Sequence, residues 1–339
     1  MKKLGRIIRT ILLVLILIAA VLFIVVEAYP MVHDRIRTGA LKTDGAASWM
    51  AGIDDEKLLS DISIPGAHDA ATNESHLRLM TKCQDRTISE ILSDGFRYLD
   101  IRLGIEKING EDNLTFYHGF LSCLADVYPW SRHLTFEDAA KACGDFLKAH
   151  PSETILFVVK KETEAGSDEA FQHLLQTLIG KSETKDLWLL TDTIPTLKEA
   201  RGKIVLFRRY ADTAGYQKQA GIFLNWENQS NKSSEGENPG AGTTETETFT
   251  LRVQDRYKYD VDAKWKVFTA TAEEGLTKKP EDVLINFLSS NGTQTYGHPY
   301  ALAAPLNQRL SESTGKLPGW TIIDFCDADL AKRIYSSNP

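Results

Sequence analysis

The chain has 339 residues, of which 42% are hydrophobic and 25% are charged. These are values of a globular protein, and they exclude a disordered or collagen-like chain. The length fits one large domain or two smaller ones. The net charge of −7 argues against a nucleic-acid partner, because proteins that bind nucleic acid usually present a basic face. The charge is uneven, since residues 1–37 carry +4 and the remainder carries −11.

The chain begins with a basic tip followed by an apolar stretch. Residues 11–26 contain no basic or acidic side chain. A membrane-spanning helix needs about 20 mostly apolar residues, so we expect residues 1–28 to be an anchor. A signal peptide cleaved near Val26-Glu27-Ala28 is the alternative, although its apolar region usually has only about 7–15 residues. In either case the basic residues at the tip predict that the rest of the chain lies outside the cell.

The four cysteines are Cys83, Cys123, Cys143 and Cys326. None belongs to a C-x-x-C pair, so the spacing does not favour a zinc site or a thioredoxin-like motif. An extracellular location would permit a disulfide. Burial as four small apolar side chains is the alternative, and the spacing does not choose between the two.

Residues 29–55 are expected to be a linker and lead-in, and residues 56–339 a single barrel domain. Nine short runs of strand-forming residues lie at 62–65, 98–103, 114–117, 154–160, 203–208, 222–226, 251–255, 283–288 and 320–324. Several of these runs are continuously apolar, as strands buried on both faces are. Helical patterns separate some of them, which predicts a parallel α/β domain and, from the number of strands, an irregular barrel.

Three helices are expected between these runs. Thr135 and Asp138 resemble a capping box with Asp in place of Glu, and apolar residues at helical spacing follow them up to Pro151. Residues 168–180 and 260–275 are the other two helical segments. Residues 228–248 are polar and rich in Gly, Ser and Thr, which predicts an exposed loop that could screen the mouth of a site.

Polar side chains gather where the apolar runs end: His68 with Asp69, Asp100 with Arg102, His118, Lys160 with Glu162, Arg209, Asp255 with Tyr257, and Asp324. In a parallel barrel the carboxyl ends of the strands open onto one face, where active sites lie. Each residue alone also has a structural explanation, because a strand-end Asp is often only a helix cap. Together they indicate a site on that face.

Two histidines and an arginine suit the cleavage of a phosphate diester. The reaction needs a base to activate an oxygen nucleophile and an acid to protonate the leaving alkoxide. Histidine performs either role near neutral pH. A guanidinium matches phosphate oxygens and offsets the charge that develops on them.

Residues 62–69, I-S-I-P-G-A-H-D, resemble the opening motif S-I-P-G-T-H-D-S of the bacterial phosphatidylinositol-specific phospholipase C family. Further similar motifs follow in the family's order at 97–102 (R-Y-L-D-I-R), 118–119 (H-G), 151–155 (P-S-E-T-I), 160–162 (K-K-E), 200–206 (A-R-G-K-I-V-L), 253–258 (V-Q-D-R-Y-K), 285–287 (I-N-F) and 319–320 (G-W). The resemblance covers residues 50–335. It implies a distorted, incompletely closed TIM-type barrel.

The resemblance also implies a reaction. The inositol 2-hydroxyl attacks the phosphorus, diacylglycerol leaves, and inositol 1,2-cyclic phosphate forms. By this resemblance His68 is the general base, oriented by Asp324, and His118 is the general acid, assisted by Asp69. Arg102 would hold the phosphate.

Four further residues match positions of the family that bind the inositol ring. Lys160, Arg209 and Asp255 would contact its hydroxyls, and Tyr257 would stack on the sugar.

The positive charge of Arg102 bears on whether the site uses a metal ion. Animal relatives hold calcium with carboxylates in this region, whereas a guanidinium supplies positive charge and repels a cation. We expect no cofactor and no dependence on calcium, although Asp100 and Glu162 remain candidate ligands.

Some positions depart from the family pattern. Ala67 and Ala70 replace a frequent Thr and Ser, so two hydroxyls near the base are missing. Tyr296 lies where some secreted relatives show an exposed Trp. An enzyme tethered by its own anchor needs less interfacial affinity of its own.

The sequence therefore predicts a phosphatidylinositol diacylglycerol-lyase, anchored in the cell membrane with an extracellular barrel. Its partner is a phospholipid at a membrane surface, with no obligate protein partner. Both free and glycosylated inositol lipids fit the pattern. The alternatives are secretion after signal cleavage, a metal-dependent phosphodiesterase on the same barrel, and a non-catalytic module that binds inositol lipids.

Overall fold

The computed structural model describes residues 2–30, 46–128, 130–229, 242–245, 248–293 and 298–339. Among them twelve strands form one curled sheet: β1 (Ile64–Ala67), β2 (Tyr98–Ile108), β3 (Glu111–His118), β4 (Leu121–Ser122), β5 (Ile155–Lys161), β6 (Trp188–Leu189), β7 (Ile204–Arg208), β8 (Ile222–Phe223), β9 (Gly242–Glu245), β10 (Thr250–Gln254), β11 (Val283–Phe287) and β12 (Trp320–Ile323). The strand order is β6-β7-β5-β2-β1-β12-β11-β10-β9, and β1, β2, β5, β6, β7, β10, β11 and β12 run parallel to their neighbours in this core. In the described residues no backbone pairing joins β8 to β9 or β10, so the barrel is incompletely closed, as expected.

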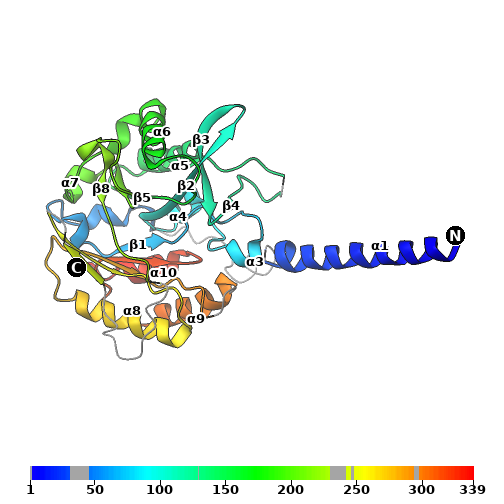
Figure 1. The fold of residues 1–339 in the computed structure, drawn as a ribbon. Helices are drawn as coiled ribbons and strands as arrows, with labels where there is room; N and C mark the ends of the chain where they lie inside the picture. The colour runs from blue at the N-terminus through cyan, green and yellow to red at the C-terminus, as the bar shows by residue number, and fades with distance from the viewer. Residues whose placement is uncertain (1, 31–45, 129, 230–241, 246–247, 294–297) are drawn as a thin grey trace.

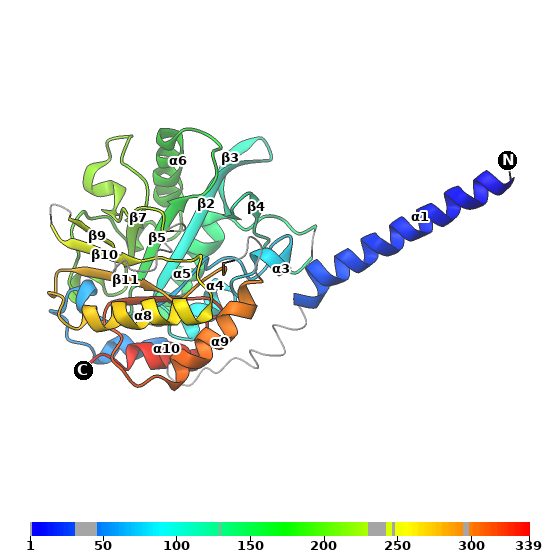
Figure 2. The same ribbon diagram turned by 60° about the horizontal axis from the view of Figure 1, so that its bottom comes forward.

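Helices cover the outside of this barrel (Figures 1 and 2). The α-helices are α1 (Lys2–Phe23), α3 (Arg78–Thr81), α4 (Ile88–Ser93), α5 (Phe136–Ala149), α6 (Asp168–Lys181), α7 (Leu197–Ala200), α8 (Val261–Gly275), α9 (Pro299–Glu312) and α10 (Ala328–Tyr335). The three expected helices are α5, α6 and α8. The expected capping box at α5 is confirmed, because the Thr135 hydroxyl accepts from the Asp138 backbone N–H and the Asp138 carboxylate accepts from Thr135.

The run at 114–117 was expected as a parallel strand, and this is wrong. β2 continues to Ile108 and turns at Asn109-Gly110, both with positive φ (53° and 89°), into the antiparallel strand β3. Such a two-residue Asn-Gly turn is the preferred connection of a tight β-hairpin. His118 therefore reaches the barrel mouth from the end of a returning hairpin strand.

Two other expectations need correction. The run at 222–226 forms a strand only at β8, because its pairing with β7 covers just two residues. Residues 242–245, inside the expected loop, form β9, which pairs antiparallel with the edge strand β10. An edge strand offers unpaired backbone groups, so even a Thr-rich segment can extend the sheet there. Residues 230–241, 246–247 and Tyr296 lie outside the described residues.

The barrel has two apolar layers, one inside and one outside the sheet. Interior side chains such as Tyr98, Val158, Phe207 and Trp320 form one cluster, and alternate residues on the same strands pack against the helices. The Trp320 ring contacts the Tyr98 and Phe207 rings at centroid distances of 5.7 and 5.3 Å. Gly66 faces this interior, where a Cβ would lie 2.3 Å from the Ile322 side chain. The opening motif therefore requires a glycine there.

The four cysteines are all free and buried. They pack as small apolar side chains, which was the alternative to a disulfide, and none of the four forms a disulfide.

The N-terminal helix projects away from the barrel (Figures 1 and 2). Among the described residues it is the one helix long and apolar enough to cross a membrane, at Lys3–Ala28 with a mean hydropathy of 3.2. A signal sequence would pass the same test. Residues 46–55 of the expected lead-in pack on the barrel, where Met50 is fully buried. The boundaries at 28 and 55 remain predictions.

Candidate active site

Strand alternation aims the polar residues into the barrel mouth. Along β2, Tyr98 lies in the interior, and Asp100 and Arg102 follow at steps of two, so they share its face. The same step from interior apolar residues on the neighbouring strands places His68, Lys160, Arg209, Asp255 and Asp324. Register brings them level, since Arg102 pairs with Lys160 and Ala67 pairs with Ile323.

A pocket of about 620 Å³ opens at this end of the barrel. Eight of the nine predicted site residues line it: His68, Arg102, His118, Lys160, Arg209, Asp255, Tyr257 and Asp324. The ninth, Asp69, is 1% exposed and lies beneath the pocket surface. All nine are thus brought to one place.

His68 is held with one nitrogen turned to the pocket. Its Nδ1 lies 2.7 Å from Asp324 Oδ1, and its Nε2 lies 2.9 Å from Arg102 Nη2. Burial opposes protonation, but Asp324 and Asp69 outweigh it and raise the pKa of His68 to about 9. When Arg102 turns towards another partner, Nε2 becomes free, and the raised pKa makes it a strong proton acceptor.

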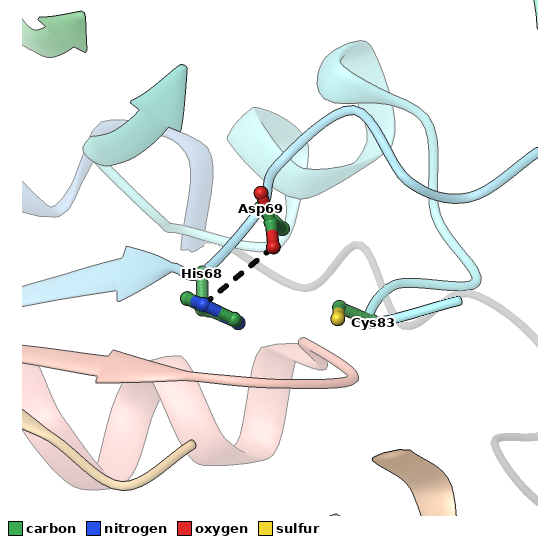
Figure 3. A group of neighbouring side chains, drawn as sticks. All are labelled: His68, Asp69 and Cys83. Atoms are coloured by element: carbon green, nitrogen blue, oxygen red, sulfur yellow. Dashed lines mark ion pairs between the residues drawn. The ribbon is translucent and has the colours of Figure 1, made fainter. Parts of the chain in front are cut away.

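Asp69 lies between the two histidines. Its Oδ2 is 3.6 Å from His68 Nε2, the ion pair drawn in Figure 3, and 3.7 Å from His118 Nε2. Asp69 has φ +43°, a conformation uncommon for a side-chain-bearing residue, and its backbone N–H donates to Asp100. Such strain persists only where surrounding contacts fix it, and it is frequent at active sites.

His118 is oriented by backbone rather than by a carboxylate. Its Nδ1 donates to the carbonyl oxygen of Thr81 at 2.8 Å, which leaves Nε2 facing Asp69 and the pocket. The two imidazoles thus present their Nε2 atoms to one carboxylate.

Arg102 lies among three carboxylates. Its guanidinium is 2.7 Å from Asp69, 3.1 Å from Asp100 and 3.6 Å from Glu162. These carboxylates raise the pKa of Arg102 further against the cost of burial, so its charge is permanent. Burial disfavours the Asp100 carboxylate, yet Arg102 and Arg209 hold its pKa well below the usual range.

Lys160 and Arg209 extend the pocket wall beside Arg102, because they share the carboxylates of Glu162 and Asp100 with it. Lys160 Nζ lies 2.7 Å from Glu162, and the Arg209 guanidinium stacks 3.8 Å above the Trp226 ring. Trp226 donates from Nε1 to Asp255 at 3.0 Å. The Tyr257 hydroxyl donates to Asn228 at 3.0 Å. This wall offers cations, a carboxylate and an aromatic face.

His68, Asp69 and Cys83 come close enough to suggest a metal centre, with one candidate ligand atom each within 4.8 Å of the others (Figure 3). The donors do not fit one. Burial raises the pKa of the Cys83 thiol well above its usual value, so no thiolate is offered. Asp69 and the Nε2 of His68 are both engaged by Arg102.

The candidate calcium ligands Asp100 and Glu162 also contact Arg102. Calcium needs six to eight oxygens, and here a guanidinium lies among the carboxylates that would supply them. Independence from calcium stays a prediction.

Comparison with known proteins shows which family the chain resembles. Residues 59–210 match the family model described as "Phosphatidylinositol-specific phospholipase C, X domain". A Staphylococcus aureus protein named 1-phosphatidylinositol phosphodiesterase is 27% identical over 312 residues, covering 86% of this chain and 94% of that protein. The chain is similar to the phosphatidylinositol-specific phospholipase C family over the X domain and, at lower identity, over most of its length.

Other relatives agree with this resemblance. A Listeria monocytogenes protein of the same name is 32% identical over 169 residues, 47% of each chain. The fold matches a solved S. aureus phosphatidylinositol-specific phospholipase C with a TM-score of 0.70, at 24% identity over 88% of this chain and 99% of the other. The L. monocytogenes enzyme matches with a TM-score of 0.62, at 23% identity over 87% and 99%. Both confirm the distorted TIM-type barrel.

Three of the predicted site residues lie beyond the matched X domain: Asp255, Tyr257 and Asp324. Asp255 directly follows the parallel strand β10, and Asp324 directly follows β12. The C-terminal strands of the barrel therefore bring these residues to the same site.

Sequence reasoning missed several supporting residues. Trp226 was counted only as the end of a strand, although an aromatic residue at the mouth is a frequent partner of a cation or sugar. Gln84 donates to the His68 and Ile323 carbonyl oxygens and ties the opening motif to β12. Its position in an irregular segment gives no pattern to detect. The Thr81 carbonyl is backbone and has no sequence signal at all.

Proposed function

We propose that the chain is a membrane-anchored phosphatidylinositol-specific phospholipase C. It cleaves phosphatidylinositol or a related inositol lipid into diacylglycerol and inositol 1,2-cyclic phosphate. The observation that carries the proposal is the constellation around Asp69: two imidazole Nε2 atoms at 3.6 and 3.7 Å and a guanidinium at 2.7 Å. The names of the relatives, 1-phosphatidylinositol phosphodiesterase, support the substrate class.

His68 acts as the general base. Substrate phosphate draws Arg102 Nη2 away from His68 Nε2, which then takes the proton of the inositol 2-hydroxyl. Asp324 keeps the other ring proton on Nδ1 and stabilises the imidazolium that forms. The 2-hydroxyl oxygen bonds to phosphorus as the bond to the glycerol oxygen breaks.

His118 acts as the general acid. Its Nδ1–H is fixed on the Thr81 carbonyl, so Nε2 gives its proton to the departing glycerol oxygen. Asp69 favours that proton before transfer, and Arg102 stabilises the charge on the phosphate oxygens during it. After release of diacylglycerol, exchange of protons with solvent restores both rings.

Lys160, Arg209, Asp255 and Tyr257 bind the inositol ring. Their cationic, anionic and aromatic groups line the same pocket as the two histidines. A headgroup with several hydroxyls meets donors and acceptors on one side, while Tyr257 offers a face for the sugar.

The N-terminal helix remains as the anchor. Its length suits one membrane crossing, and its basic tip favours a cytoplasmic N-terminus with an extracellular barrel. The enzyme then meets its lipid in the membrane that holds it.

Phosphorus NMR tests the proposal. The full chain in detergent micelles is mixed with phosphatidylinositol and excess chelator, and the resonance of a five-membered cyclic phosphate is the expected product. His68→Ala should abolish it, and His173→Ala, which removes an exposed imidazole of α6, should not. Product only after calcium is added would establish the metal-dependent phosphodiesterase instead. Headgroup binding without turnover, on free and glycosylated inositol lipids alike, would establish the binding module.

A further inference from the structure

The end of the N-terminal helix is joined to the barrel by a carboxylate. The helix continues through a π-helical turn at Ile24–Ala28, which carries Glu27. Glu27 Oε1 accepts from the Leu77 backbone N–H at 2.7 Å, and Glu27 Oε2 accepts from Arg78 Nη1 at 3.0 Å. Its side chain is only 12% exposed in this contact. A charged residue at the end of a membrane segment is stabilised by such a partner.

Arg78 is the partner of Glu27 on the barrel, and it donates the hydrogen bond. It is 1% exposed, and its other donors are used on the Glu74 carboxylate at 2.9 Å and the Val127 carbonyl at 2.6 Å. Leu77 has φ +54°, an uncommon conformation for a residue with a branched side chain. The bond from its N–H to Glu27 therefore stabilises a strained turn at the start of α3.

The segment held in this way forms part of the active-site wall. Within α3, Met80 and Thr81 line the pocket. The carbonyl oxygen of Thr81 is the acceptor that orients His118. A continuous path of hydrogen bonds and four residues of backbone thus leads from the membrane helix to an imidazole of the site.

We propose that Glu27 is a positioning residue, through which the membrane helix fixes α3 and so holds His118 in its working orientation. This rests on the proposed function for what His118 does, but the joint itself is independent of the reaction. Cleavage after Ala28 would remove Glu27 and leave Arg78 with Glu74 and the Val127 carbonyl. The retained helix is then part of the site as well as its tether.

The joint also fixes which face of the barrel lies nearest to α1. The segment around β4 lies on the side of the barrel from which α1 projects, in both Figures 1 and 2. Phe120, directly before β4, is 82% exposed and lines the pocket, and Trp130 is 81% exposed. Tryptophan is enriched at the membrane interface, and an exposed apolar ring such as that of Phe120 can bury itself there. A fixed joint would hold them, and the pocket mouth, against the membrane that α1 crosses.

Amide hydrogen exchange of the full chain in lipid nanodiscs tests the joint. Glu27→Ala should increase exchange in residues 76–82 at least about tenfold, because a buried charge-assisted hydrogen bond is lost. Glu27→Gln keeps an acceptor for Leu77 without the charge and should give a smaller increase. Glu111→Gln removes an exposed carboxylate of the β3 hairpin and should change nothing. Equal protection in all four chains would overturn the proposal.

Kinetics with a water-soluble inositol phosphodiester test the positioning role without a lipid surface. Glu27→Ala should lower kcat about tenfold with KM within about twofold, since α3 orients the acid more than it binds the ring. A leaving group that needs no protonation should remove most of this loss. Lost protection with an unchanged kcat would overturn the positioning role. A wild-type chain without turnover would overturn the proposed function, and exchange alone would then decide the joint.

Discussion

The contact between Asp324 and His68 makes a prediction about pH. Asp324 lies 2.7 Å from the imidazole and Asp69 lies 3.6 Å from it. Against the cost of burial, these carboxylates raise the pKa of His68 from 6.5 to about 9. The proposed base works only when neutral, so kcat/KM should rise with pH through this pKa.

Asp324→Asn keeps the shape of the side chain and removes its charge. The nearer carboxylate is the larger cause of the elevation, so the pKa of His68 should fall towards its usual value. A lower pKa of the base moves the acidic limb of the profile to lower pH. The plateau should also fall on the order of 10²-fold, because an amide can turn its NH₂ towards Nδ1 and favour the wrong tautomer.

The assay is kcat/KM against pH with a soluble inositol phosphodiester, which reports groups of the free enzyme. Asp112→Asn is the matched control, since it removes an exposed carboxylate at the tip of the β3 hairpin. An acidic limb that stays in place, or moves to higher pH, would refute the reasoning that His68 sets this limb. A lowered plateau with an unmoved limb would mean that Asp324 only orients the ring.

Three further predictions concern other parts of the barrel. His118→Ala should slow cleavage of the lipid by about 10²- to 10⁴-fold, but far less with a nitrophenyl leaving group, and a comparison of the two substrates checks this. Arg102→Lys should lower kcat by about 10²- to 10³-fold, with no recovery on calcium titration, because a lysine lacks the planar donors that reach several oxygens. Glu153→Gln should destabilise the fold by about 3 to 5 kcal/mol in denaturant titrations while kcat at low temperature is kept, since it leaves the fully buried Arg97 without its partner.

The fold could largely be predicted because its strands are marked by continuous apolar runs. Val158 and Val205 lie in runs whose alternate residues face the barrel interior and the helices, so both faces are apolar. The hairpin was missed although Asn109-Gly110 is typical of a tight hairpin turn. The run at 114–117 was interpreted as another parallel strand instead. β9 was missed for a different reason, since its pairing depends on an available edge rather than on its own composition.

The nine site residues could be predicted because strand ends and motif order point to one face. Their electrostatic arrangement could not. Nothing in the sequence indicates that Asp69 lies between two imidazoles, or that Arg102 contacts three carboxylates. These relations depend on register between strands far apart in the chain. The sequence also gives no sign of the contact at Glu27, because its partners lie about fifty positions away at the start of the four-residue helix α3.

The motifs that the chain shares with the family include residues at both the amino and the carboxyl ends of the barrel strands. The residues at these two ends have different roles. Residues 97–102 begin with Arg97, which forms a buried ion pair with Glu153 at the amino end of β2, and finish with Arg102 at the mouth. Arg201 lies at the same amino end and donates to the Met50 and Ser152 carbonyls. These matches preserve the fold, and only the residues at the carboxyl ends can touch substrate. Similarity of motif therefore identifies the barrel, while strand direction and the step of two residues decide which positions perform chemistry.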